Sequence, residues 1–116
     1  MNIFKLFYSE KSIKRKIIDI KEDIKKNITP LCNETFWIDQ YGAYNIDPKY
    51  LVFWICVETD ELKLKLKSNA LLKNDLRNLL VKHNYPEQAR SFVHIDFESQ
   101  ETVDRESAGN WYDHFK

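Results

Sequence analysis

His94, Asp96 and Glu98 alternate along one short stretch of the chain, and they are the residues best placed to do chemistry together. Alternate residues of a β-strand point to the same side with their Cβ atoms roughly 7 Å apart, so these groups would converge on one ion or substrate. A half-exposed strand alternates polar and apolar residues without any site, and no further His or Cys lies nearby to complete a zinc site. The spacing therefore favours a plain polar face, or a protein-binding surface, over a metal site or an acid/base centre.

Catalytic and cofactor-binding motifs are absent from the chain. Gly42 and Gly109 are the only glycines, so a glycine-rich phosphate loop, a dinucleotide fingerprint and a GxSxG nucleophile motif are excluded. The HExxH zinc motif is also missing, and the histidines lie at no recognised metal-ligand spacing. We expect no cofactor and no bound metal, and the sequence favours a protein that is not an enzyme.

Acidic residues gather at the carboxyl end of the chain. Residues 91–116 hold six acidic and two basic side chains, a net charge of −4, whereas residues 1–29 hold eight basic and four acidic ones, a net charge of +4. Solvated helix faces also collect charged residues, but a cluster of one sign can steer a partner of the opposite sign. The candidate binding residues for a basic partner are Asp96, Glu98, Glu101, Asp104 and Glu106.

Three classes of function fit these patterns. The favoured class is a small intracellular protein-binding module, such as a bacterial immunity protein or antitoxin that neutralises a basic protein through its acidic carboxyl-terminal segment. The alternative is a small metal-dependent or acid/base enzyme that uses His94, Asp96 or Glu98. The second alternative is an adaptor that binds nucleic acid through the basic residues 11–26, which the acidic residues interspersed among those lysines make less favoured.

The acidic segment requires a strand followed by a short helix. The pattern of residues 92–97 predicts a strand whose Val93, Ile95 and Phe97 face a helix. Ser99 is then placed to cap a short helix that ends at Gly109. The apolar side chains that follow are expected to pack back onto the domain: Trp111, Tyr112 and Phe115.

Two longer helices and two further strands are expected before this segment. A stripe of isoleucines at helical spacing predicts a helix over residues 12–27, and Asn69 is placed to cap a second one that ends near His83. Aromatic residues predict a strand within residues 35–44, bent at Gly42. Residues 50–57 are apolar on both sides of the pleat, which is typical of a central strand.

Residues 60–67 are ambiguous between strand and helix. Leu62, Leu64 and Leu66 alternate with lysines, and this period of two favours a strand. Leucine and lysine form helices more readily than strands, so a helix that begins at Asp60 is the competing interpretation. We favour the strand slightly.

The composition predicts one α+β domain that spans residues 1–116. Its expected architecture is an antiparallel sheet of three to four strands, with two main helices packed on one face and a short carboxyl-terminal helix. Cys32 and Cys56 are too few for a disulfide scaffold, which favours the reducing cytoplasm. The apolar run in residues 1–8 is too short for a secretory signal, and we expect neither a transmembrane segment nor membrane association.

Overall fold

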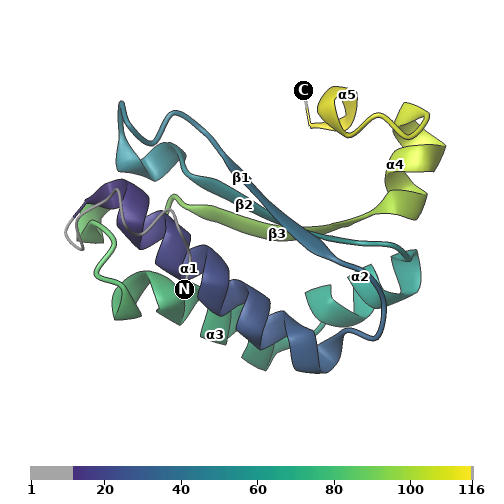
Figure 1. Cartoon of the computed structure of the whole chain (residues 1–116), viewed down its shortest axis with the longest axis horizontal. Helices are drawn as coiled ribbons and strands as arrows, with labels where there is room; N and C mark the ends of the chain where they lie inside the picture. The colour runs from purple at the N-terminus through teal and green to yellow at the C-terminus, as the bar shows by residue number, and fades with distance from the viewer. Residues whose placement is uncertain (1–11, 116) are drawn as a thin grey trace.

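The computed structural model of the chain describes residues 12–115, so the apolar run at residues 1–8 lies outside the described residues. Five α-helices and three strands are present in this part of the chain, and the expected α+β class is confirmed (Figure 1). The helices and strands follow in the order α1 (Ile13–Ile28), β1 (Trp37–Tyr41), β2 (Val52–Val57), α2 (Asp60–Lys67), α3 (Ala70–Lys82), β3 (His94–Ser99), α4 (Gln100–Ser107) and α5 (Trp111–His114). Short 3₁₀ turns occupy Thr29–Leu31, Pro48–Tyr50 and Glu87–Ala89.

Helix α1 forms where the isoleucine stripe predicts it. The Ser12 side chain accepts a hydrogen bond from the backbone N–H of Arg15, which satisfies one of the free donors at the helix start. The helix ends at Ile28, immediately before Thr29 and Pro30. Its inward face is fully apolar, with buried isoleucines at 17, 20, 24 and 28.

The sheet is mixed, which corrects the expectation of an antiparallel sheet. Strand β2 is central, as predicted, and it pairs antiparallel with β1 but parallel with β3. The two helices α2 and α3 lie between β2 and β3 in the chain, and such a helical crossover is how a chain returns to start a parallel strand. The direction of β3 is therefore set by this connection and not by any residue within the strand.

Residues 60–67 form helix α2, so the slight preference for a strand is wrong. The Thr59 side chain accepts from the backbone N–H of Leu62 and caps the helix. Leu62 and Leu66 are one helical turn apart and both are buried, whereas Leu64 is 60% exposed. Leucines that alternate along a chain are also four residues apart in pairs, as Leu62 and Leu66 are, so the same pattern fits a helix. The cap and the helix propensity of Leu and Lys favour the helix here.

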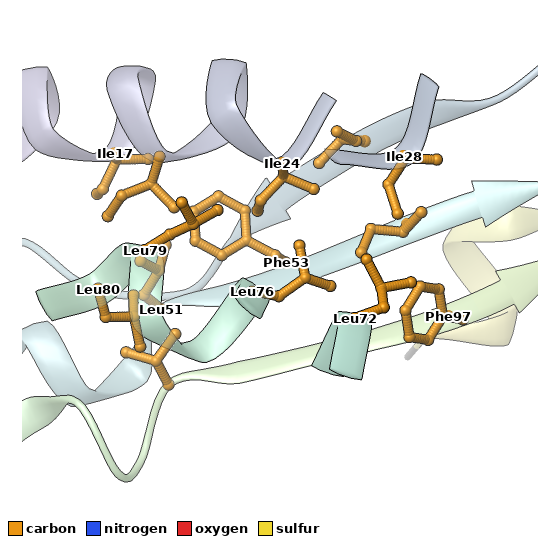
Figure 2. Packing of buried hydrophobic residues seen from close by; sticks show 14 of the residues in the cluster. Ile17, Ile24, Ile28, Leu51, Phe53, Leu72, Leu76, Leu79, Leu80 and Phe97 are labelled. Atoms are coloured by element: carbon orange, nitrogen blue, oxygen red, sulfur yellow. The ribbon is translucent and has the colours of Figure 1, made fainter. Parts of the chain in front are cut away.

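The core lies between the sheet and helices α1 and α3. Phe53 and Ile55 of the central strand are fully buried, and Phe97 of β3 extends the same face. Figure 2 shows isoleucines of α1 and leucines of α3 around Phe53. The prediction that the main helices cover one face of the sheet is confirmed.

Helices α4 and α5 lie on the opposite side of the sheet from α1 and α3 (Figure 1). Ser99 caps α4 as predicted, and Ala108 and Gly109 reverse the chain with positive φ angles of 51° and 79°. Trp111 and Phe115 then pack against aromatic residues of the sheet, whereas Tyr112 stays 77% exposed.

Candidate functional site

His94, Asp96 and Glu98 lie on the outer face of the sheet, away from α1 and α3, as their alternation predicts. The three side chains differ in environment, because those of His94 and Asp96 are 51% and 34% exposed while that of Glu98 is 12% exposed. His94 Nε2 lies 3.8 Å from Asp96 Oδ2, and Lys67 Nζ lies 3.7 Å from Asp96 Oδ1. The strand thus brings the three residues to one face, but their side chains turn to different partners.

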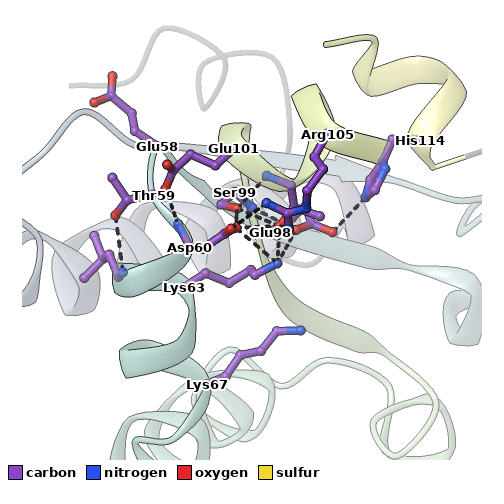
Figure 3. A network of polar contacts seen from close by, with 12 residues as sticks. Glu58, Thr59, Asp60, Lys63, Lys67, Glu98, Ser99, Glu101, Arg105 and His114 are labelled. Atoms are coloured by element: carbon purple, nitrogen blue, oxygen red, sulfur yellow. Dashed lines mark hydrogen bonds and ion pairs between the residues drawn. The ribbon is translucent and has the colours of Figure 1, made fainter. Parts of the chain in front are cut away.

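Glu98 is engaged within the protein through both carboxylate oxygens. Lys63 Nζ donates to Oε1 at 2.9 Å, the backbone N–H of Ser99 also donates to Oε1 at 2.9 Å, and His114 Nε2 lies 2.8 Å from Oε2 (Figure 3). Burial raises the pKa of Glu98, but the hydrogen bonds from Lys63 and His114 outweigh it, so the net pKa is lowered. Glu98 therefore links α2, β3 and α5, and both of its oxygens are already engaged within the protein.

Asp60, the first residue of α2, links this helix to α4. Its carboxylate accepts from Ser99 Oγ at 2.5 Å, Thr102 Oγ1 at 2.6 Å and Arg105 Nη1 at 2.9 Å. The hydroxyls of Ser99 and Thr102 and the guanidinium of Arg105 hold the pKa of Asp60 well below its usual range. Arg105, the basic residue of α4, thereby pairs with Asp60, while its side chain stays 60% exposed.

The remaining predicted binding residues lie on α4. Glu101 Oε1 accepts from the backbone N–H of Asp60 at 2.7 Å and so caps the start of α2, although Glu101 remains an exposed residue. Asp104 and Glu106 are exposed, and Asp104 Oδ1 accepts from Gln100 Nε2 at 2.8 Å. Of the predicted residues on α4, Asp104 and Glu106 thus stay exposed without a hydrogen bond to another element.

Sequence reasoning missed three residues that organise this region. Lys63 and His114 neutralise Glu98, and the Glu34 carboxylate accepts from the backbone N–H groups of Glu58 and Thr59 at 2.8 and 2.9 Å. Each of these contacts joins segments at least 16 residues apart, and no local spacing indicates them.

Aromatic side chains cover much of the outer face of the sheet. Trp54 of β2 stacks on Phe115 with ring centroids 4.5 Å apart, and Trp37 meets Trp111 edge-on at 5.0 Å. Trp54 Nε1 donates to the Tyr41 hydroxyl at 2.8 Å, which ties this aromatic layer to β1. A groove of about 450 Å³ opens beside the layer, between β1 and α5, and it is lined by Asp39, Gln40, Tyr41, Trp111, Tyr112 and Phe115.

Thiol chemistry is not favoured at either cysteine. Cys56 is fully buried, and burial together with the nearby charges of Asp39 and Glu98 raises its pKa to about 12, so a reactive thiolate does not form near neutral pH. Cys32 is half-buried, and its thiol lies 3.1 Å from the backbone carbonyl of Glu34. Within residues 12–115, no group of three or more His, Cys, Asp or Glu side chains is arranged to hold a metal ion.

Helix α1 carries acidic residues among its basic ones. Arg15 pairs with Asp19 at 3.3 Å, and Asp23 attracts Lys26 of the same helix as well as Lys82 and the Nε2 atom of His83. Burial raises the pKa of Asp23, but its hydrogen bonds to Lys82 and His83 lower it overall. The positive charges of this helix are therefore partly neutralised by its own acidic residues, whereas Lys82 and His83 offset the negative charge of Asp23.

No helix within the described part of the chain has the length and apolar character needed to cross a membrane. Comparison with known proteins gives no match, whether with family models, with curated proteins or with solved structures.

Proposed function

We propose that the chain is a protein-binding module that binds a basic protein through the acidic surface of α4 and the adjoining end of β3. An immunity protein or antitoxin that blocks a basic toxin domain is the kind of protein that works in this way. The observation that carries the proposal is the pair Asp104 and Glu106, which project from a helix whose one basic residue, Arg105, is already paired with Asp60.

The rigidity of α4 supports the proposal. Thr102 and Val103 are buried beneath the helix, and the Asp60 carboxylate ties Ser99, Thr102 and Arg105 to α2. Buried polar side chains in the described part of the chain all have hydrogen-bond partners. A charged surface on such a fixed support loses little conformational entropy when a partner binds, and it accelerates the encounter with an oppositely charged protein.

The other two function classes receive less support from the contacts. An enzyme that uses His94, Asp96 and Glu98 would need a free carboxylate at Glu98, whose oxygens are held by Lys63 and His114. A nucleic-acid adaptor would need an unbroken basic face on α1, where acidic side chains neutralise part of the charge. Cys32 and Cys56 are free thiols, which fits our proposal of a reducing compartment such as the cytoplasm.

The proposal is tested by measuring the affinity of the purified chain for the products of its neighbouring genes, at low and high ionic strength. We expect one basic protein to bind, with an affinity that falls as salt increases. Combined charge reversal by Asp104→Lys and Glu106→Lys should weaken this binding about tenfold or more, mainly through slower association.

A matched control reverses charges elsewhere on the surface. Asp75 on α3 and Glu87 in the turn before β3 are exposed acidic residues far from α4 in the sequence, and Asp75→Lys with Glu87→Lys changes the net charge by the same amount. Binding that survives reversal at Asp104 and Glu106, or that falls equally in the control, would contradict the proposed surface.

A further inference from the structure

Strand β1 is an edge strand of the sheet formed by residues 12–115. The strand order is β1, β2, β3, so β1 bonds to β2 on one side, and no strand of the described residues lies along its other side. Its sequence, Trp37–Tyr41, contains neither the proline nor the lysine that often protect such an edge. An exposed edge of this kind can accept an extended segment of another protein as an additional strand.

The groove between β1 and α5 lies beside this edge on the outer face of the sheet. Tyr41 forms one wall, and Trp111 and Phe115 form the other, with ring centroids of Tyr41 and Phe115 6.3 Å apart and those of Trp111 and Phe115 5.6 Å apart. Helix α5 is seen above the open face of the sheet in Figure 1. At these distances the rings contact one another and form one aromatic surface, and an exposed ring face attracts a cation stacked on it from outside.

One carboxylate faces this aromatic groove, that of Asp39. Asp39 is exposed, and its carboxylate makes no hydrogen bond or ion pair with any residue of the described chain. Asp96 occupies the corresponding position on the opposite edge, since Trp54 lies between the two in the register, but Asp96 already has Lys67 nearby at 3.7 Å. Asp39 is thus an acidic group in an aromatic surrounding whose positive partner is missing.

We propose that this groove binds an arginine side chain of the basic partner, carried by an extended segment that pairs with the free edge of β1. A guanidinium can stack flat on an aromatic ring and still donate a pair of hydrogen bonds to a carboxylate, which the compact ammonium of lysine cannot do. The inference rests on the proposed function in taking the partner to be a basic protein, and it adds the group that is recognised.

A second groove indicates which residue types should flank the arginine in the bound segment. It has a volume of about 480 Å³, lies between β1 and α1 on the other face of the sheet, and shares Gln40 with the first groove. Ile18, Phe36 and Ile38 are the apolar part of its lining, which also includes Lys21, Glu22 and Lys25 of α1. Residues of an added strand alternate between the two faces, so the neighbours of the arginine should be apolar and should point toward α1.

A second copy of the chain fits this edge poorly. Antiparallel pairing of two β1 strands about their centre would place Asp39 opposite its equivalent, and like charges directly opposite each other destabilise a sheet. A basic segment from a different protein has the complementary charge.

The experiment uses the peptide acetyl-Thr-Val-Arg-Val-Thr-amide as the probe and titrates it into the ¹⁵N-labelled full chain. We expect concentration-dependent shifts of the backbone amides of residues 37–41 and of the Trp111 indole N–H. Asp39→Asn should weaken the peptide about tenfold, because one charge-assisted contact is lost, whereas the matched Asp75→Asn, at an exposed aspartate of α3, should bind as the wild type does. Peptides with citrulline or lysine in place of arginine should bind more weakly than the arginine peptide.

Unchanged amide spectra, shifts confined to other elements, equal affinity of the wild type and Asp39→Asn, or a lysine peptide that binds as tightly would each overturn the proposal. The spectra of Asp39→Asn away from β1 and α5 report whether the variant folds. If the double reversal at Asp104 and Glu106 weakens capture of the basic partner while the peptide still fails to bind, the arginine groove is wrong and the proposed function stands. If the peptide binds through Asp39 while that reversal has no effect on the partner, the acidic surface of α4 is wrong instead.

Discussion

Replacement of Glu98 by glutamine should destabilise the protein by loosening the junction of α2, β3 and α5. The substitution keeps the shape of the side chain but removes its charge. The charged partners left to Lys63 are then reduced to the more distant carboxylate of Asp60 at 3.8 Å, beside its 2.6 Å hydrogen bond to Thr102, and His114 loses its acidic partner.

The expected cost follows from these contacts. A hydrogen bond to a charged group contributes about 1.5–3 kcal/mol, and a glutamine at position 98 can still accept one of the two side-chain bonds, so we expect a net loss of about 2 kcal/mol. The remaining ion pair of Lys63 with Asp60 keeps the loss below the roughly 3–5 kcal/mol seen when a buried charge is left alone. For a domain of this size the change corresponds to a fall in Tm of about 8 °C.

Urea unfolding followed by circular dichroism measures the free energy of unfolding of both proteins as a function of pH. The pKa of Glu98 is lowered in the folded state, so its contribution to stability is fully present above the pKa of the unfolded chain and is lost as the pH falls through the folded-state value. We therefore expect the wild type and Glu98→Gln to differ near neutral pH and to converge as the pH falls through the lowered folded-state pKa of Glu98.

Glu106→Gln is the matched control, because it removes the charge of an exposed glutamate on α4 and should change the free energy of unfolding by less than about 0.5 kcal/mol. The reasoning is refuted if Glu98→Gln is no less stable than this control, or if its deficit is the same at low pH as at neutral pH.

Three further changes test the packing and the turns by the same unfolding measurement. Gly42→Ala should cost about 2 kcal/mol or more, because φ is +106° and an added Cβ would lie 1.9 Å from the Tyr50 carbonyl oxygen; stability equal to the wild type would contradict this tight approach. Phe53→Ala should cost about 3–5 kcal/mol, since the ring is fully buried in the central strand, and a loss under about 1 kcal/mol would mean that this core is not packed as described. Asp23→Asn should cost about 1 kcal/mol near neutral pH through loss of its contact with His83. The cost should be smaller at low pH, because the pKa of Asp23 is lowered in the folded state and its stabilising contribution is therefore lost as the pH falls. A deficit independent of pH would argue against the ion pair.

The elements predicted correctly from the sequence are those whose determinants are local. Helix α1 has its cap, its isoleucine stripe and its terminating proline within the same short stretch. The central position of β2 follows from apolar residues on both sides of its pleat, because only a strand covered on both faces needs them.

The two errors in the predicted fold have different causes. In one, a local pattern fits two structures; in the other, a distant part of the chain determines the direction of a strand. The leucines of α2 satisfy a period of two and an i, i+4 spacing together, and the cap at Thr59 selects the helix. The parallel direction of β3 depends on the crossover through α2 and α3, which the composition of β3 does not reveal.

The sequence predicts which residues of the candidate site share one face of the sheet, but not their partners. Alternation places Asp96 and Glu98 on the same side of β3, but the partners that neutralise Glu98 are Lys63 on α2 and His114 on α5. The groove beside β1 depends on the carboxyl-terminal helix folding back over the sheet, and sequence reasoning indicated only that the aromatic tail would pack somewhere.

The net charge counted along residues 91–116 is more negative than the charge that this segment presents at the protein surface. Glu98 is neutralised inside the fold and Asp96 lies close to Lys67, so two of the acidic side chains in residues 91–116 contribute little to the outer field. Arg105 pairs with Asp60, so part of its charge is already offset before a partner meets Asp104 and Glu106 on the same helix. Charge reversal at Glu98 would consequently change the stability of the fold. Only charge reversal at exposed carboxylates can test whether this surface binds a partner.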